Sequence, residues 1–357
     1  MYTQENIRDR IPAKAQPVVK KGEFVISAAG MDHPHIYGMV KSLCAAGATL
    51  KYVYDTDGEK VAKLLAQYPE AKAARSYDEI LDDKETQLVA CAAIPSLRGP
   101  MGVRAMRAGK DYFSDKAPFT TLEQLDEAKK TVAETGKKYA VCYSERLQNE
   151  SAVLAGYLID AGAIGKVLQV TGFGPHRIGA PRAPWFYRYE TYGGILCDIG
   201  SHQIEQYLAY TGEADADVTM SRVGNYAHPE TPEFEDFGDC ALTGRNGTTN
   251  YFRVDWFTPD GLRTWGDGRT LILGTKGYIE LRKFINVAAD ATGNHLFMTD
   301  GEGETHIDAN GLTGCPYFGD LILDCLNRTE NAMTQEHAFK AAELCLKAQK
   351  AAVHVSK

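Results

Sequence analysis

Short apolar runs alternate with amphipathic stretches over the first 145 residues of the chain. The runs at 23–30, 87–93 and 138–144 hold mainly apolar and small residues, which is typical of strands buried on both faces. Between such runs, apolar residues recur every three or four positions, as they do over 36–44. This alternation predicts a parallel sheet with helices on both faces. Ligands bind such sheets at the carboxyl ends of the strands.

The turn after the first predicted strand holds part of a dinucleotide-binding fingerprint. In the pattern G-x-G-x-x-G the matching residues are Ala28, Gly30 and His33, so only the middle glycine is present. Asp55 ends the second predicted strand, where a carboxylate can accept a hydrogen bond from a ribose 2′-hydroxyl. The neighbouring Asp57 suits the N-cap of the next helix, which leaves Asp55 free for a cofactor. Because a carboxylate repels a 2′-phosphate, we expect NAD and not NADP.

Two helices of this half have predicted starting points. The helix over 97–109 should begin only after Pro100, since proline lacks the N–H that a helix interior needs. The helix that ends at Gly136 should begin with a capping box formed by Thr120 and Glu123.

The pattern changes after about residue 164. Asn246 and Gly247 lie between two strand-like runs, which predicts a hairpin, and 269–284 has the pattern strand–turn–strand. A helix near the end of the chain has a face of small residues. These features predict an α+β domain on a mostly antiparallel, open sheet.

The chain therefore divides into three predicted parts. Residues 1–22 form a polar leader that we expect to be loosely held. Residues 23–146 form a doubly wound parallel α/β domain of the Rossmann type that binds NAD. Residues 147–357 form the α+β domain for substrate binding and oligomerisation, and its last helix can pack back on the first domain.

The segment 192–203, YGGILCDIGSHQ, places an acid and an imidazole on one helix face. Asp198 and His202 are four residues apart, which corresponds to roughly 5–6 Å between their Cβ atoms. A buried hydrogen bond and acid–base chemistry both fit this spacing. A zinc site that adds Glu205 is a third interpretation.

No metal is expected in either candidate place. No cysteine or second histidine is spaced to complete a ligand set with Asp198, His202 and Glu205. The segment 32–35, DHPH, also invites a metal interpretation. Pro34, and the position of the segment at the phosphate-binding turn, instead favour the interpretation that it replaces the missing glycine turn. His33 would then lie near the pyrophosphate or the mouth of the cofactor site.

The order of these parts resembles the glucose–fructose oxidoreductase/inositol dehydrogenase (Gfo/Idh/MocA) family. Asp115–Lys116–Ala117–Pro118 stands where the family has E-K-P, with a shorter acid and an extra alanine. The family pattern G-G-G-x-x-x-D-x-G-x-H matches 192–202, with Tyr192 in place of the first glycine. Two further segments, 93–96 and 143–146, stand where relatives contact the cofactor.

This resemblance implies an NAD-dependent dehydrogenase acting on CH–OH groups. It assigns catalysis to Lys116, Asp198 and His202. His202 takes the hydroxyl proton, Lys116 stabilises the developing alkoxide, and Asp198 binds substrate or stabilises the imidazolium. The expected cofactor contacts, from the turn and the family motifs, are Gly30, Met31, His33, Asp55, Pro95, Ser96, Asp115, Lys116 and Arg146.

The substrate is expected to be a small sugar, glycoside or related polyol. Aromatic and hydrogen-bonding residues between the two motifs suit a sugar ring, and no phosphate-binding cluster stands out. The candidate substrate-binding residues are His176, Arg177, Trp185, Tyr192, Asp198 and His202. Oxidation of a secondary ring hydroxyl, best at C3 of a glucoside, is the leading interpretation. An inositol dehydrogenase, a redox-type NAD-dependent glycosidase and a non-catalytic NAD or sugar sensor are the alternatives.

Charge and composition limit the partners and the cellular compartment that we expect. The formal net charge is −8 and no basic run occurs, which argues against a nucleic acid partner. The 8 cysteines are scattered without a C-x-x-C pair, as expected for free thiols in a reducing compartment. No signal peptide and no apolar run of about 18 residues is present, so we expect a cytoplasmic protein without a membrane span. The resemblance and the open sheet together predict a homo-oligomer.

Overall fold

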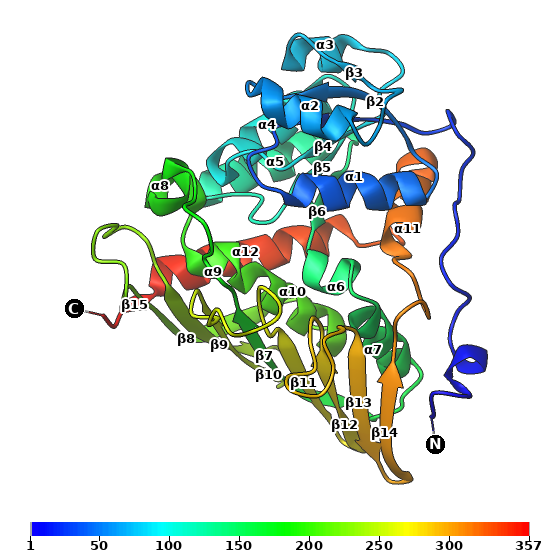
Figure 1. The fold of residues 1–357 in the computed structure, drawn as a ribbon, viewed down its shortest axis with the longest axis vertical. Helices are drawn as coiled ribbons and strands as arrows, with labels where there is room; N and C mark the ends of the chain where they lie inside the picture. Colours follow the sequence, from blue (N-terminus) through cyan, green and yellow to red (C-terminus); the bar gives the residue numbers. More distant parts are fainter. Residues whose placement is uncertain (1, 357) are drawn as a thin grey trace.

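The computed structural model describes residues 2–356 and contains two sheets with helices packed around and between them (Figure 1). The first sheet has six parallel strands in the order β3-β2-β1-β4-β5-β6. This order reverses direction beside β1, as in a doubly wound nucleotide-binding sheet. The strands are β1 Val25–Ala29, β2 Thr49–Tyr54, β3 Lys72–Ala73, β4 Leu88–Cys91, β5 Asp111–Asp115 and β6 Tyr139–Cys142.

Helices connect these strands and cover both faces of the sheet (Figure 1). The apolar stripe over 36–44 becomes the buried face of α1, and strands β1, β4 and β6 are mainly apolar and buried, which confirms the predicted α/β half. The helices are α1 His35–Ala45, α2 Gly58–Leu65, α3 Tyr77–Asp82, α4 Pro95–Arg107 and α5 Leu122–Thr135.

The predicted late start of α4 is wrong. This helix begins at Pro95 and contains Pro100 in its second turn. Pro100 cannot donate to the carbonyl of Ser96 four residues earlier, and the side-chain amide of Gln124 donates to that carbonyl instead, at 3.0 Å. A side chain from the neighbouring helix α5 thus supplies the hydrogen bond that the proline cannot make within its own helix.

The cap of α5 lies one residue later than predicted. Thr121 is the N-cap, and its hydroxyl accepts from the N–H of Gln124 at 3.3 Å. The Gln124 side-chain oxygen accepts from the N–H of Thr120 at 3.0 Å. The start of the helix is therefore capped by Thr121, with Gln124 reaching back to the residue before the cap, and not by a capping box of Thr120 and Glu123. The predicted end of this helix at Gly136, which has a φ of 66°, is confirmed.

The second sheet has nine strands in the order β14-β13-β12-β11-β7-β10-β9-β8-β15. All neighbours pair antiparallel except β7 with β10 and β8 with β15. Both predicted hairpins are present, and the mostly antiparallel architecture is confirmed. The strands are β7 Val167–Pro175, β8 Ala216–Gly224, β9 Phe237–Gly244, β10 Thr249–Asp255, β11 Arg269–Gly274, β12 Gly277–Arg282, β13 His295–Asp300, β14 Gly303–Asp308 and β15 Val353–His354.

The helices of this second domain lie on the side of its sheet that faces the first domain (Figure 1). Within residues 2–356, no helix lies on the other face of the sheet (Figure 1). The helical segments are α6 Ser144–Leu147, α7 Glu150–Asp160, η2 Pro184–Tyr187, α8 Tyr189–Tyr192, α9 Ile195–Asp198, α10 Gly200–Thr211, α11 Tyr317–Asn327 and α12 Gln335–Ala351.

The last long helix, α12, lies between the two domains (Figure 1). The side chain of Gln335 accepts from the N–H of Tyr139 and donates to its carbonyl, so it completes the edge of β6. Tyr143 donates to the carbonyl of Ala338 at 3.1 Å. The expectation that this helix packs back on the first domain is confirmed.

The N-terminal segment is held more firmly than predicted. Ile7, in the short helix η1 Ile7–Arg10, is fully buried. The Gln4 side chain pairs with the backbone of Asp308 in β14, and Ala15 donates to the carbonyl of Thr313. Long-range backbone pairing therefore orders a polar stretch whose composition predicts a loose leader.

Candidate active site

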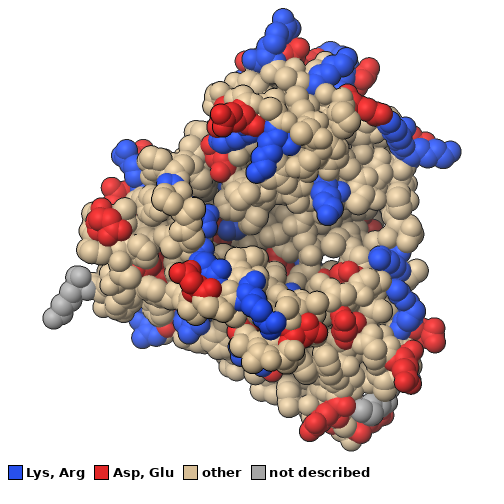
Figure 2. All heavy atoms as spheres, viewed as in Figure 1, with Lys and Arg blue, Asp and Glu red and all other residues tan. Residues whose placement is uncertain are grey.

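The carboxyl ends of β1, β4, β5 and β6 meet at one edge of the first sheet, opposite α9 and α10 of the second domain. Figure 2 shows the molecule hollowed between the two domains, with acidic and basic side chains at the edge of the hollow. Lys116 follows β5 and Asp198 ends α9, so the two residues come from different domains. The Lys116 ammonium donates to Asp198 Oδ1 at 2.6 Å, and both residues are buried.

This ion pair determines the ionisation of Asp198. Burial by itself would raise the pKa of this carboxyl group. The Lys116 ammonium outweighs burial through its charge and its hydrogen bond, and it holds the pKa of Asp198 below the ordinary value. Asp198 therefore remains an anion that orients the lysine.

His202 lies on α10 and is 2% exposed, and burial gives it properties that the sequence did not indicate. Burial lowers the pKa of His202 to about 3, the charge of Glu145 opposes this shift, and Lys116 lowers the pKa further. Its Nδ1 atom is buried and has no hydrogen-bond partner among residues 2–356. The imidazole is therefore neutral at ordinary pH, and it is a weaker base than an exposed histidine.

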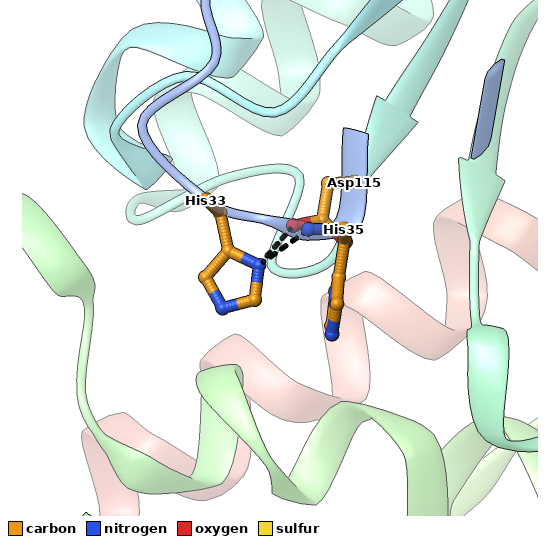
Figure 3. Close-up of side chains that lie close together, drawn as sticks. All are labelled: His33, His35 and Asp115. Carbon is orange, nitrogen blue, oxygen red and sulfur yellow. Dashed lines mark hydrogen bonds and ion pairs between the residues drawn. The ribbon is translucent and has the colours of Figure 1, made fainter. Parts of the chain in front are cut away.

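Two histidines, His33 and His35, lie beside Asp115 at the first turn of the cofactor domain (Figure 3). His35 Nδ1 lies 2.9 Å from Asp115 Oδ1, and His33 Nδ1 lies 3.4 Å from Oδ2. The buried Arg98 forms an ion pair with the same carboxylate at 3.1 Å. Arg98 also donates to the carbonyls of Lys116 and Ala117. It thereby fixes the backbone that carries the lysine, a role that no sequence motif indicated.

The three side chains in Figure 3 could geometrically hold a metal ion, because their ligand atoms lie within 4.8 Å of one another. The charges around Asp115 argue against this use. Burial would raise the pKa of Asp115, but His35 and Arg98 hold it far below the ordinary value. The carboxylate also accepts from the N–H of Lys116 at 2.8 Å. Its negative charge is already balanced by the guanidinium of Arg98, whose positive charge would repel a metal ion.

The first turn fits a dinucleotide through its backbone. Gly30 has a φ of 73°, and a Cβ atom there would lie 2.6 Å from the Cβ of Ala93. Glycine therefore lets the turn after β1 pass close to the segment that follows β4, at the point where the strand order reverses. Asp55 accepts from the N–H of Met31 at 2.6 Å. This contact ties the end of β2 to the turn, as the predicted cofactor site requires.

A lysine lies beside the acid that we expect to bind the ribose. The Lys60 ammonium is 2.7 Å from Asp32 Oδ1 and 3.6 Å from Asp55 Oδ1. Lys60 follows Asp55 closely in the sequence and lies in the first turn of α2. Asp57 is the N-cap of α2, as predicted.

The other predicted cofactor contacts divide into two groups. Pro95 and Ser96 open α4 directly after β4 and lie at the correct edge of the sheet. Arg146 also follows a strand of this sheet, but its guanidinium forms an ion pair with the buried Glu205. Because His337 contacts the same carboxylate, Glu205 belongs to a separate cluster, and the zinc interpretation that combines it with Asp198 and His202 loses this ligand.

The predicted substrate residues also divide. The ring of His176 packs against Trp265 and Trp256, and the charges of Glu145, Lys116 and Asp198 all act on its pKa, which burial lowers to about 4. His176 therefore lies near Lys116 and Asp198. Arg177 donates to the carbonyls of Pro259 and Leu262 and so braces a loop.

Tyr192 and Trp185 have structural surroundings. Tyr192 is 1% exposed, and its hydroxyl accepts from the N–H of Glu235. Trp185 and Tyr192 both pack against Phe186 within an aromatic cluster. For both residues, packing within this cluster agrees better with a structural role than with the predicted substrate contact.

Comparison with known proteins identifies the family. Residues 30–143 match the family model described as an oxidoreductase family with an NAD-binding Rossmann fold. Residues 154–280 match the C-terminal domain of the Gfo/Idh/MocA family. The chain belongs to the Gfo/Idh/MocA family. Both motifs that carried the resemblance lie within the two matched ranges, and the resemblance is confirmed.

Similar proteins include enzymes that act on sugars and polyols. The solved structure of a protein from Erwinia carotovora atroseptica SCRI1043, named only as an oxidoreductase, is 48% identical, with a TM-score of 0.91 over 93% of this chain and 100% of that chain. The scyllo-inositol 2-dehydrogenase (NAD(+)) of Bacillus subtilis strain 168 is 29% identical over 71% of this chain and 72% of that protein. The D-xylose dehydrogenase of Paenarthrobacter nicotinovorans is 28% identical, but the match spans only 38% of that enzyme.

The fold also occurs in more distant solved structures. Levoglucosan dehydrogenase, solved with NADH and levoglucosan, is 17% identical and has a TM-score of 0.74 over 91% of this chain. Relatives differ in the cofactor that their names state, since one scyllo-inositol 2-dehydrogenase of Bacillus subtilis is named for NADP(+). The comparisons therefore support a nicotinamide cofactor in general. Among residues 2–356 no helix is both long and apolar enough to cross a membrane.

Proposed function

We propose that this protein is an NAD-dependent dehydrogenase that oxidises a secondary ring hydroxyl of a sugar, glycoside or related polyol, with C3 of a glucoside as the best candidate. The observation that carries the proposal is the bond between Lys116 and Asp198. It brings a cation from the cofactor domain and an anion from the substrate domain together, near His202, at the ligand-binding edge of the sheet. Bound NAD would accept a hydride from the carbinol carbon.

The residues of the site supply the remaining chemistry. The Lys116 ammonium can donate to the substrate oxygen and stabilise its developing negative charge. His202 is neutral and can take the hydroxyl proton. Asp198 holds the Lys116 side chain in place through their ion pair. We propose that the dinucleotide is held by Gly30, Met31, Asp55, Pro95 and Ser96. His33 and Asp115 would lie at the inner end of the bound dinucleotide.

The preference for NAD rests on Asp55. Its carboxylate can accept from a 2′-hydroxyl and repels a 2′-phosphate, although the nearby Lys60 reduces that repulsion. We therefore expect a preference for NAD that is smaller than an isolated acid would produce.

Inositol oxidation is the second candidate function. The match to the scyllo-inositol 2-dehydrogenase covers most of both chains, and an inositol presents the same ring hydroxyls. A redox-type glycosidase would use the same residues for its first step. A non-catalytic sensor is disfavoured, because Lys116 and His202 are both present and buried in the site.

A single-turnover experiment tests the proposal. Stoichiometric protein and NAD are mixed in turn with methyl glucoside, glucose and inositol, and the near-ultraviolet absorbance of reduced nicotinamide is recorded. We expect absorbance with a glycoside for the wild type and none for Lys116→Ala. Signal only with inositol would favour the second candidate. No signal with any of these compounds, despite NAD binding, would contradict the proposed dehydrogenase.

We further propose that the protein is a homo-oligomer assembled through the uncovered face of the second sheet. Leu168, Leu271, Leu273 and Tyr278 lie on neighbouring strands and are each more than two-fifths exposed. A second copy would cover this apolar patch. Light scattering should show an oligomer for the wild type and for Leu97→Lys, on the first domain. Leu271→Lys with Leu273→Lys should be a monomer, and a monomeric wild type would refute the assembly.

The compartment is part of the same proposal. All 8 cysteines are free, and six of them are buried. Unpaired thiols fit a reducing compartment such as the cytoplasm.

A further inference from the structure

A buried polar cluster lies directly behind His202. Glu145, in α6 at the junction of the two domains, accepts from the Lys283 ammonium at 2.6 Å and from the Gln203 side chain at 3.1 Å. Lys283 follows β12 and is 1% exposed, and it also donates to Gln206 at 3.0 Å. Gln206 in turn donates to the carbonyl of His202. The cluster therefore fixes Glu145 relative to the helix that carries His202.

Two buried atoms of this region lack hydrogen bonds. Glu145 Oε1 and His202 Nδ1 are both inaccessible to solvent, and neither has a partner within residues 2–356. Glu145 uses only Oε2 toward Lys283 and Gln203. Buried polar atoms are rarely left unpaired in native proteins, so an acceptor and an imidazole nitrogen left over in the same region call for an explanation.

Electrostatics connects the two groups. Burial would raise the pKa of Glu145, but Lys283 lowers it to about 2, with His202 as the next cation-forming group that acts on it. The same interaction acts on His202. Of the main charges that act on its pKa, Glu145 alone raises it, whereas Lys116, His35 and His176 all lower it. Asp198 does not have this role toward His202, because its carboxylate is bound to Lys116.

We propose that Glu145 is a positioning residue for His202. Its negative charge keeps a proton on Nδ1 of the neutral imidazole, which leaves the lone pair of Nε2 available. One part of this inference rests on the proposed function. When the substrate O–H bond breaks, its proton passes to Nε2 of His202, and Glu145 stabilises the resulting imidazolium. Lys283 holds Glu145 in place and keeps it ionised, so neither residue needs to touch substrate or cofactor.

The test removes the buried pair as a unit. The double variant Glu145→Leu with Lys283→Met leaves no unpaired buried charge, so it has a better chance of folding than either single change. Glu213→Gln is the matched control, since Glu213 is a similarly buried glutamate that instead braces the loop at Asn246. The tautomer of His202 is read from long-range ¹H–¹⁵N spectra of protein labelled at its 9 histidines, assigned with His202→Asn.

The inference predicts a proton on Nδ1 of His202 in the wild type and in Glu213→Gln, and a shift toward Nε2 in the double variant. In that folded variant we expect kcat to fall about 10²-fold, while the dissociation constant for NADH stays within about twofold. An unchanged tautomer in the folded double variant would overturn the inference. The spectra need no substrate, so this result stands apart from the single-turnover experiment, which tests the dehydrogenase itself.

Discussion

Burial controls the acid–base behaviour of the residues that we place in catalysis. His202 loses its affinity for protons because it is removed from water, whereas Asp198 remains ionised because Lys116 is bound to it. The same burial makes each contact between them stronger than it would be at the surface. At the residue scale, the environment of each side chain therefore matters as much as its identity.

Glu235 is the clearest case of a carboxyl group whose ionisation the fold resists. It is 3% exposed, and burial raises its pKa from 4.5 to about 7, although Ile195 N–H and the Gln349 amide donate to it. The folded state thus holds a proton that the unfolded chain releases, and stability falls as the pH rises from about 4.5 to about 7. Glu235→Gln imitates the protonated form and should remove that loss.

The measurement is urea unfolding of wild type and Glu235→Gln at pH 5 and pH 8. We expect near-equal stability at pH 5 and an advantage for the variant of roughly 3 kcal/mol at pH 8, from the size of the pKa shift. A difference that does not change with pH would show that Glu235 is not the titrating group.

Side-chain contacts between elements set the boundaries of several helices. The helix α4 begins before Pro100 because Gln124 satisfies the carbonyl that the proline leaves free. The helix α5 begins after Thr121 because Gln124 also reaches back to Thr120. Apolar periodicity predicted that both helices exist, but it carries no information about such contacts. At the scale of the element, type is therefore easier to predict than boundary.

The revised cap of α5 leads to a direct prediction. Thr121→Ala removes the hydroxyl that accepts from Gln124 and should lower the free energy of unfolding by about 1 kcal/mol. Thr120→Ala is the matched control and should lower it by much less. Urea unfolding of both variants decides between the two caps, and a larger loss for Thr120→Ala would restore the capping box predicted from the sequence.

The whole molecule is joined by α12. Phe339 on this helix is 5% exposed, and its ring packs against Phe119 and Tyr139 of the first domain at 6.2 and 5.9 Å between centroids. Lys129 of α5 also forms an ion pair with Glu343 at 3.1 Å. Because the helix also packs on α10, the two domains share one core, and that core holds the residues that we propose as catalytic in place relative to one another.

Phe339→Ala should weaken that shared core. We expect a loss of about 3–5 kcal/mol, the usual range for a buried phenylalanine, and a broadened or split transition in differential scanning calorimetry. Phe257→Ala, at a residue that is 44% exposed, should leave the single transition nearly unchanged. A single, sharp transition for Phe339→Ala would mean that the domains are coupled elsewhere.

The sequence by itself determined the fold of the two domains and marked Lys116, Asp198 and His202 as candidate catalytic residues, because apolar periodicity and short motifs are local properties of a chain. Arg98, Glu145 and Lys283 escaped prediction, since no spacing connects residue 145 with residue 283, and their charges look like ordinary surface charges in the sequence. Only the tertiary structure decided that Asp198 bonds to Lys116, that Arg146 is bound by Glu205, and that Tyr192 lies in an aromatic cluster. Burial and the pairing of charges depend on segments far apart in the chain, and they are settled when those segments pack together.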